Sequence, residues 1–587
     1  MRHSIATMAL AGSLQEKMQA AAKAGFDAIE LFENDLIQCS LSTTQIRDMA
    51  AGLRLKLDIY QPLRDFEGVS PAQLLRNLDR AERKFDTLQA LGIDLMLVCS
   101  NAQPDALGDR QLIADQLAEL AQRAARRHLR IGFESLSWGT HCNRWSHAWD
   151  AVSRAGEDSL GLILDSYHTL ALRDDFTGIS EIPGERIFYL QLSDAPFEAT
   201  SPPLYTRPLR TFPGLGQFDM IGFVATVLST GYQGALSLEI FSDEFRGAPA
   251  QSTARAARAS LIWLEEQLSR QPGRTQKQPL AIPPAVSSSA RCSYLQLNTD
   301  AASRQTLDTQ LSALGLTTAE AHLTVELRAS MAPGVSVHAL GISVSDPEAA
   351  QRRAEAFGYR AGTGEQAGTV APDGSGLRFT PLRNAPQQEA QGARLASIIR
   401  AVPTGMLDSW ATFYHLTTGL KPTTPLLKHD PHGVVRGRLL RGSELAIELE
   451  TSTHQRTLAA GASVDQSITR LVFEVPDLVA CLGNLRVRGI ETLAIAANYY
   501  DDLAARYALQ PERLDELRQL NVLYDAQPQG EYLHACLTPF ANGLCFELIE
   551  RRGSYTGTDM ANAYVLHAAL SNCLPSVSTS TVDGQGQ

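Results

Sequence analysis

Two patterns of apolar positions follow one another in turn along the first half of the chain. Between residues 4 and 267, short strand-like runs are separated by longer stretches with apolar residues at 3- and 4-residue spacing, which is typical of amphipathic helices. The runs are SIATMAL, AIELFE, LKLDIYQ, LMLVCS, RIGFES, GLILDS, FYLQLS and ALSLEIF. Gly25 predicts a stop for the first helix. Eight strand–helix units predict an α/β fold, a (β/α)8 barrel over residues 1–268.

The alternation breaks at residues 269–290, where Pro, Gln and Ser dominate, and this predicts an interdomain linker. Within the predicted second domain, residues 291–556, a unit of strand, helix and several further strands recurs about four times between residues 291 and 552. This order predicts an α+β domain. We expect residues 557–587 to form a tail that ends in a disordered segment, CLPSVSTSTVDGQGQ.

Polar residues stand at the C-terminal ends of four of the predicted barrel strands. Glu134, Asp165, Gln191 and Glu239 follow the fifth to eighth apolar runs. These strand ends meet at one mouth of a barrel, and carboxylate and amide oxygens suit a hard divalent cation. The alternative is that each side chain is paired separately, by a helix N-terminus or a loop amide. Asp194 also follows the seventh run, and could belong to the same set.

Other polar residues lie in loops at the same predicted mouth. His168 comes three residues after Asp165, where it could transfer protons or be purely structural. Arg64 follows the third strand, and Arg207 and Arg210 begin a Gly/Pro-rich loop after the seventh. Guanidinium groups there could bind a substrate carboxylate, or form surface ion pairs and turns.

Composition narrows the function classes. The chain of 587 residues is 44% apolar and 20% charged, with a net charge of -12 that is spread out. This charge argues against nucleic acid and anionic membrane as partners. The eight cysteines form no CxxC pair, and no apolar run approaches the roughly 18 residues of a membrane span. We therefore expect a cytoplasmic protein with reduced thiols.

The first half resembles a known family in several motifs. The strand-end set resembles that of the xylose-isomerase-like sugar isomerase and epimerase barrels. The segments FENDL, QPLRDFEG, AERKFD, LVCSN, ILDSYHTL, FPGLG and LSLEIF are similar to those of the bacterial 3-dehydroshikimate dehydratases. The two-domain members of that family carry a C-terminal half similar to 4-hydroxyphenylpyruvate dioxygenase, a vicinal-oxygen-chelate protein. LDSWATFY, NYYDDLAARY, NVLYD and FELIERRGSY match that half.

The resemblance implies an activity and a role for each candidate residue. The activity is the dehydration of 3-dehydroshikimate to protocatechuate in quinate and shikimate catabolism. A proton leaves next to the metal-bound ketone, and the β-hydroxyl leaves as water. Mg²⁺, Mn²⁺ or Co²⁺ is the expected cation. The implied ligands are Glu134, Asp165, Gln191 and Glu239; Arg64 and Arg210 would bind the substrate and His168 would transfer protons.

The second half departs from its dioxygenase relatives at the iron ligands. The two His positions of the facial triad are Ser397 and Arg470 here, and only the carboxylate, Glu547, remains. We expect Arg470 to pair with Glu547 and the domain to be non-catalytic. His534 lies near this carboxylate in the sequence, and could restore a site only under a different alignment.

Two other functions stay open from the sequence. A sugar or hydroxypyruvate isomerase could use the same metal-binding barrel. The chain could also be a binding or regulatory protein, which suits the second half better than the first. The sequence predicts a small-molecule substrate and leaves open whether the protein forms a homo-oligomer.

Overall fold

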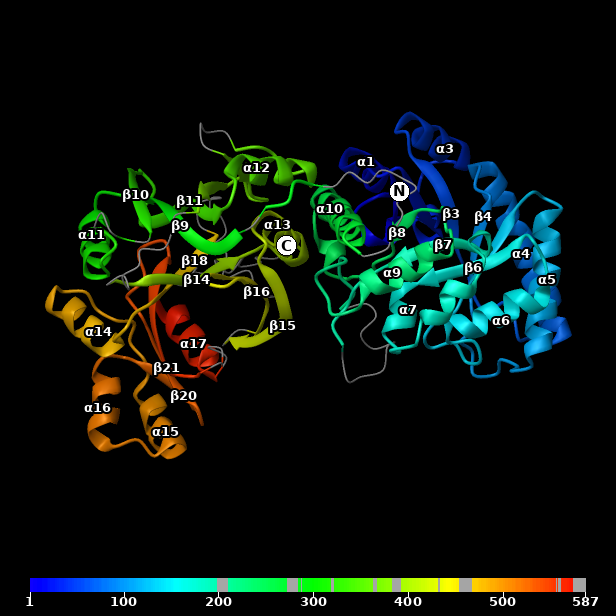
Figure 1. Ribbon diagram of the computed structural model, residues 1–587. Coiled ribbons are helices and arrows are strands. Elements are labelled where there is room, and N and C mark those ends of the chain that lie inside the picture. Colours follow the sequence, from blue (N-terminus) through cyan, green and yellow to red (C-terminus); the bar gives the residue numbers. More distant parts are fainter. Residues whose placement is uncertain are drawn as a thin grey trace, which may run out of the picture. The chain divides into compact units, whose positions relative to one another are not determined.

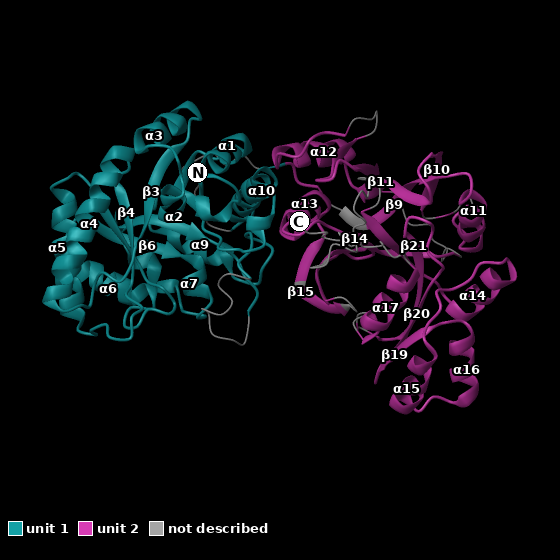
Figure 2. Ribbon diagram, turned by 180° about the vertical axis from the view of Figure 1, so that it is seen from behind, with its two compact units in different colours: residues 1–283 teal, residues 284–587 magenta. Residues whose placement is uncertain are grey.

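The computed structural model divides the chain into two compact units, residues 1–283 and 284–587 (Figure 1 and Figure 2). It describes residues 1–197, 209–271, 283–286, 288–317, 321, 323–362, 367–382, 392–430, 433–452, 467–555, 557 and 561–573. The division falls inside the predicted linker 269–290, of which residues 272–282 and 287 lie outside the described part.

Unit 1 is a closed barrel of eight parallel strands in the order β1 to β8, as predicted. The strands are β1 (His3–Ala6), β2 (Ala28–Phe32), β3 (Lys56–Leu63), β4 (Leu95–Cys99), β5 (Arg130–Glu134), β6 (Leu160–Asp165), β7 (Ile187–Leu192) and β8 (Leu236–Leu238). Their residues are almost all buried, because helices cover the outside and side chains fill the inside. The predicted first strand is too long, since residues 7–9 of SIATMAL form a buried 3-10 turn.

Helices surround this barrel (Figure 1). They are α1 (Leu14–Ala24), α2 (Glu33–Ile37), α3 (Thr43–Gly52), α4 (Pro71–Leu91), α5 (Arg110–Ala125), α6 (Trp145–Ala155), α7 (Ser166–Leu170), α9 (Met220–Ser229) and α10 (Ala250–Ser269). Ser13 and Glu16 form a capping box at the start of α1, and Gly25 ends it with φ 88°. The predicted stop at Gly25 is therefore confirmed.

Unit 2 is an α+β domain built on two mixed sheets. The five-stranded sheet has the order β10-β9-β11-β13-β12, and the eight-stranded sheet has the order β15-β16-β17-β14-β18-β21-β20-β19. The first sheet comprises β9 (Ser288–Thr299), β10 (Thr324–Ala329), β11 (Val335–Val344), β12 (Gly368–Val370) and β13 (Gly376–Pro381). The second comprises β14 (Arg394–Ala401), β15 (Lys421–Asp430), β16 (Gly433–Arg441), β17 (Ala446–Ser452), β18 (Ile468–Glu474), β19 (Leu523–Gln527), β20 (Gly530–Cys536) and β21 (Cys545–Gly553).

The helices of unit 2 are α11 (Arg304–Ala313), α12 (Pro347–Ala356), α13 (Leu407–Thr418), α14 (Leu478–Val487), α15 (Ala497–Tyr507), α16 (Pro511–Gln519) and α17 (Ala563–Cys573). Helix α17 lies within the predicted tail 557–587, which is therefore not a tail throughout. It buries Leu566 and Ala569 and packs on β15. Asn562, directly before it, donates a hydrogen bond to His534 Nε2 at 3.2 Å. The predicted disordered end lies outside the described part from residue 574 onward.

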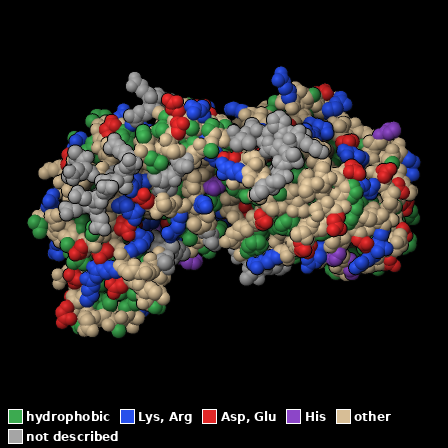
Figure 3. Space-filling view, viewed as in Figure 1, with side chains coloured by type: hydrophobic (Ala, Val, Ile, Leu, Met, Phe, Trp, Pro, Cys, Tyr) green, Lys and Arg blue, Asp and Glu red, His purple; other side chains and the backbone are tan. Residues whose placement is uncertain are grey.

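Two surface properties bear on partners. Among the described residues, no helix is long and apolar enough to cross a membrane. On the face seen in Figure 3, basic and acidic side chains are interspersed over both units, in keeping with the spread of charge in the sequence.

Candidate metal and substrate site in the barrel

The predicted ligand residues lie at the C-terminal ends of neighbouring barrel strands. Glu134 ends β5, Asp165 ends β6, Gln191 is the penultimate residue of β7, and Glu239 directly follows β8. All four side chains are buried. The strands are parallel and in register, with Asp165 opposite Gln191, so these ends open onto the same mouth of the barrel.

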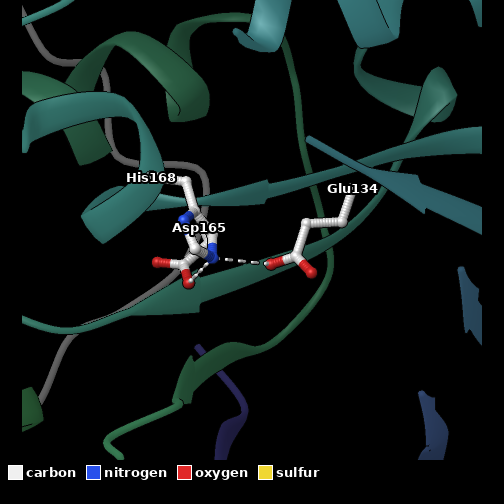
Figure 4. Close-up of side chains that lie close together, drawn as sticks. All are labelled: Glu134, Asp165 and His168. Atoms are coloured by element: carbon white, nitrogen blue, oxygen red, sulfur yellow. Dashed lines mark ion pairs between the residues drawn. The ribbon is translucent and has the colours of Figure 1, made fainter. Parts of the chain in front are cut away.

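Two of these carboxylates form a tight group with His168 (Figure 4). Ligand atoms of Glu134, Asp165 and His168 all lie within 4.8 Å of one another. The Nε2 atom of His168 is 3.5 Å from Asp165 Oδ2 and 3.8 Å from Glu134 Oε1. Asp165 also caps the short helix α7 by accepting a hydrogen bond from the Tyr167 N–H at 2.7 Å. This cap directs α7 so that His168 returns over the end of β6.

Two oxygen atoms of the predicted set are buried without a hydrogen-bond partner. They are Glu134 Oε1 and Gln191 Oε1. A buried acceptor left unpaired costs about 1–3 kcal/mol, so such atoms call for a ligand. Carboxylate and amide oxygens are the ligands that hard divalent cations prefer. The side chains present therefore fit a divalent cation.

Arg210 lies among the same carboxylates. Its Nη1 donates to Asp165 Oδ2, to Glu239 Oε2 and to the Glu239 carbonyl oxygen, each at 3.1 Å. The guanidinium carbon also lies 4.1 Å from the centre of the Tyr167 ring. Arg210 lines the cavity, as a substrate-binding residue must, but its contacts here are mainly to two of the predicted ligands.

The titration of these acids reflects their crowding. Burial raises the pKa of Glu239 to about 7, and the neighbouring Asp165 charge adds to the effect. Burial, followed by the charges of Glu239 and Asp165, also raises the pKa of Glu134 well above its usual range. Like charges in a desolvated space disfavour ionisation. The group is therefore stabilised by any cation that enters it.

His168 is buried and neutral. Burial lowers the pKa of His168 to about 3, although the Asp165 carboxylate opposes this shift. Its Nδ1 accepts a hydrogen bond from the Ser137 N–H at 3.1 Å, and Ser137 Oγ lies 3.2 Å from the same nitrogen. Because Nδ1 accepts this hydrogen bond, the imidazole carries its proton on Nε2, and that proton points toward the carboxylates.

A cavity of about 650 Å³ opens over this group. Trp138, Leu136, Phe32 and Phe241 form apolar walls, and the ring of Trp138 lies edge-on to His168 at 4.9 Å. On the side of β3 and α4, the cavity is lined by cations, Arg64, Arg80 and Lys84. Arg64, which the sequence predicted to bind the substrate, is exposed at the rim of the cavity.

Arg80 and Lys84 were not singled out from the sequence. Their spacing of four residues on one face of α4 is the signal that could have identified them. Lys84 contacts the carboxylate of Glu33, which also accepts a hydrogen bond from Tyr60 Oη at 2.9 Å.

Two other candidates have different outcomes. Asp194 accepts hydrogen bonds from the backbone N–H groups of Gly214, Gly216 and Phe218, each at 3.0 Å, so it organises a loop. Its backbone pairs with Thr211, the neighbour of Arg210, and so fixes where Arg210 enters the site. Arg207 lies outside the described residues.

The predicted pairing in unit 2 is confirmed. Arg470 Nη1 lies 3.0 Å from Glu547 Oε2, and His534 Nδ1 lies 2.8 Å from Glu547 Oε1. All three side chains are buried. His534 is thus a direct partner of Glu547, which the sequence did not predict. Ser397 lines a cavity of about 170 Å³ together with Glu547.

Comparisons with known proteins identify the family. Residues 18–267 match the family model described as a xylose isomerase-like TIM barrel. The 3-dehydroshikimate dehydratases of Pseudomonas putida and Pseudomonas aeruginosa are each 39% identical over 622 aligned residues, which cover 97% of this chain and 98% of each relative. The chain belongs to the 3-dehydroshikimate dehydratase family.

The two-domain form of this family is also known as a solved structure. That structure is a xylose isomerase-like TIM barrel/4-hydroxyphenylpyruvate dioxygenase fusion protein, 38% identical, with a TM-score of 0.85. The match covers 97% of this chain and 99% of the other. This chain therefore has a (β/α)8 barrel followed by a dioxygenase-like domain, as the sequence predicted.

The buried pair in unit 2 yields a stability prediction. Replacing Arg470 by Ala removes the guanidinium that balances the buried charge of Glu547, which costs roughly 3–5 kcal/mol. Urea unfolding followed by circular dichroism measures this loss. Arg551→Ala, which removes a half-exposed arginine of β21 that lies 3.6 Å from Glu474, is the control and costs at most about 1 kcal/mol. Equal losses in the two variants would contradict the prediction.

Proposed function

We propose that this protein is a hydro-lyase that converts 3-dehydroshikimate to protocatechuate at the barrel mouth, a step of quinate and shikimate catabolism. The observation that carries the proposal is the 39% identity to named 3-dehydroshikimate dehydratases over 97% of the chain. The site supports it independently, because buried carboxylate and amide oxygens lie below a cavity with a cationic side.

The proposed ligands of the divalent cation are Glu134, Asp165, Gln191 and Glu239. The two unpartnered oxygens, Glu134 Oε1 and Gln191 Oε1, are the strongest support for this set. Mg²⁺, Mn²⁺ and Co²⁺ are the candidate ions. When bound, the cation supplies Lewis-acid polarisation of the substrate ketone.

The cations of the cavity suit the carboxylate of the substrate. Arg64 at the rim, with Arg80 and Lys84 beside it, binds this group, so the ketone and hydroxyls face the buried end of the cavity. Arg210 lies deeper, where it neutralises Asp165 and Glu239 and can donate to a substrate hydroxyl through the edge that lines the cavity. Such positioning makes the proton transfer intramolecular.

His168 is the proposed proton-transfer residue. The carbon between the ketone and the departing hydroxyl loses its proton, the C–O bond breaks, and proton and hydroxide leave together as water. Transfer of a proton from a carbon of the substrate ring to the ketone oxygen then gives the aromatic product. To accept the first proton at Nε2, His168 must take the tautomer with its own proton on Nδ1. That nitrogen then gives up the hydrogen bond from the Ser137 N–H and donates to Ser137 Oγ, which lies 3.2 Å away. Ser137 thus controls which tautomer faces the substrate.

The sugar or hydroxypyruvate isomerase alternative fits the comparisons less well, since the dehydratase relatives span both units. A sugar substrate would also lack a carboxylate for the cationic side of the cavity. We propose a non-catalytic role for unit 2, because Arg470 and His534 occupy both oxygens of Glu547. The eight cysteines are free thiols, which supports the proposed cytoplasmic location. Small molecules are the expected partners.

The activity and its metal dependence can be tested together. Adding 3-dehydroshikimate to metal-loaded protein should raise the near-ultraviolet absorbance as the aromatic product forms. We expect EDTA to abolish the change and Mg²⁺, Mn²⁺ or Co²⁺ to restore it. A metal-replete protein that forms no protocatechuate would falsify the proposed function.

The carboxylate-binding role of Arg64 predicts a specific kinetic defect. Losing one charge-assisted hydrogen bond costs about 1.5–3 kcal/mol, so Arg64→Ala should lower kcat/KM roughly 10- to 100-fold, mainly through KM. The control is Arg83→Ala, which removes an exposed arginine of α4 that pairs with Asp79 outside the cavity. Unchanged kinetics in Arg64→Ala would show that the carboxylate binds elsewhere.

A further inference from the structure

Glu30 lies in the middle of β2, directly below the proposed metal site, and its side chain is completely buried. Its carboxylate accepts three hydrogen bonds. Gln61 Nε2 and Gln191 Nε2 both donate to Oε2 at 2.7 Å, and Ser237 Oγ donates to Oε1. These donors come from β3, β7 and β8, so Glu30 connects strands that are distant around the barrel.

The contact with Gln191 determines which end of its amide faces the site. An amide carries an oxygen acceptor and an NH2 donor that are nearly equal in shape, and hydrogen bonds decide how it is turned. Because the Glu30 carboxylate can only accept, it holds the NH2 group of Gln191 and turns the oxygen away. That oxygen is buried and has no hydrogen-bond partner. It is left available as a ligand.

We propose that Glu30 is the positioning residue that directs the oxygen of the Gln191 amide, rather than its nitrogen, toward the divalent cation. The donated hydrogen bond also draws electron density toward the amide oxygen, which makes it a better ligand. This inference rests on the metal site proposed above.

The alternative is that Glu30 has a purely structural role. Glu30 could connect the strands without any effect on the cation. Substitutions separate the two roles, since only positioning makes the metal affinity depend on which way the amide of Gln191 points.

Glu30→Met removes the acceptor, so the Gln191 amide loses its fixed orientation. We expect Mn²⁺ to bind about 10- to 100-fold more weakly, as for other groups that orient metal ligands. Glu30→Gln keeps one acceptor oxygen for both amides, and the Ser237 hydroxyl can rotate to accept, so this variant should stay within a few-fold of wild type. Free Mn²⁺, measured by electron paramagnetic resonance during titration of the full chain, gives the affinities.

Gln191→Glu in the Glu30→Met background supplies the decisive measurement. A carboxylate presents an oxygen whichever way it turns, so the double variant should recover most of the lost affinity. Because the added charge by itself strengthens cation binding, the gain is compared with that of Gln191→Glu in the wild-type background, where positioning predicts a smaller gain and general damage an equal one. The melting temperature in EDTA reports such damage separately. Glu265→Met removes a buried acid that holds the N-terminus at 2.8 Å, and should lower this temperature while leaving Mn²⁺ affinity unchanged.

The outcomes are distinguishable. Wild-type affinity in Glu30→Met, or a double variant as weak as the single one, overturns the positioning role. If Glu30→Met does not fold, Glu30→Asp, which keeps the charge but withdraws the acceptor, should still weaken binding, and unchanged affinity there overturns the role equally. A wild-type protein that binds no divalent cation at all would instead defeat the proposed metal site.

Discussion

Negative charge enclosed in the barrel is the constraint on which the site depends. Glu30, Glu134, Asp165 and Glu239 are all buried. Burial, together with the charges of Glu239 and Asp165, raises the pKa of Glu30 and of Glu134 well above the usual range. Burying uncompensated ions costs several kcal/mol each, so positive charge must enter this space. Arg210 supplies one such charge, and the Asp194 loop holds it there. A divalent cation is the natural complement, and a ketone substrate then meets a strong electrostatic field.

Unit 2 meets the same constraint with a different partner. Its single remaining carboxylate, Glu547, has a guanidinium on one oxygen and an imidazole on the other. Both partners come from the protein, so the charge is balanced without a metal. The barrel leaves oxygen atoms unpartnered, whereas this cluster occupies the oxygens of its carboxylate. The pairing of the carboxylate oxygens, and not the fold, therefore distinguishes a site that can accept a cation from one that cannot.

The sequence predicted the barrel, its eight strands and the four strand-end residues, because period and strand polarity depend on local pattern. It also predicted the pair of Arg470 and Glu547. It did not predict that Asp194 would organise a loop, because nothing local reveals which backbone N–H groups a carboxylate will meet. Helix α17 was missed because its apolar side is short and follows an irregular stretch. Arg80 and Lys84 were missed because their helix face is set by packing.

Glu30 shows most clearly what could not be predicted from the sequence. In AIELFE it is a polar residue in the middle of an apolar strand, and its partners Gln191 and Ser237 are 161 and 207 residues away in the chain. Only closure of the barrel brings them together. The strand ends provide the atoms that can bind a cation, and they can be recognised from sequence. The proposed orientation of the Gln191 amide depends on its hydrogen bond to Glu30, which exists only in the folded barrel. A ligand set carried over from sequence therefore specifies a metal site only together with the layer that orients it.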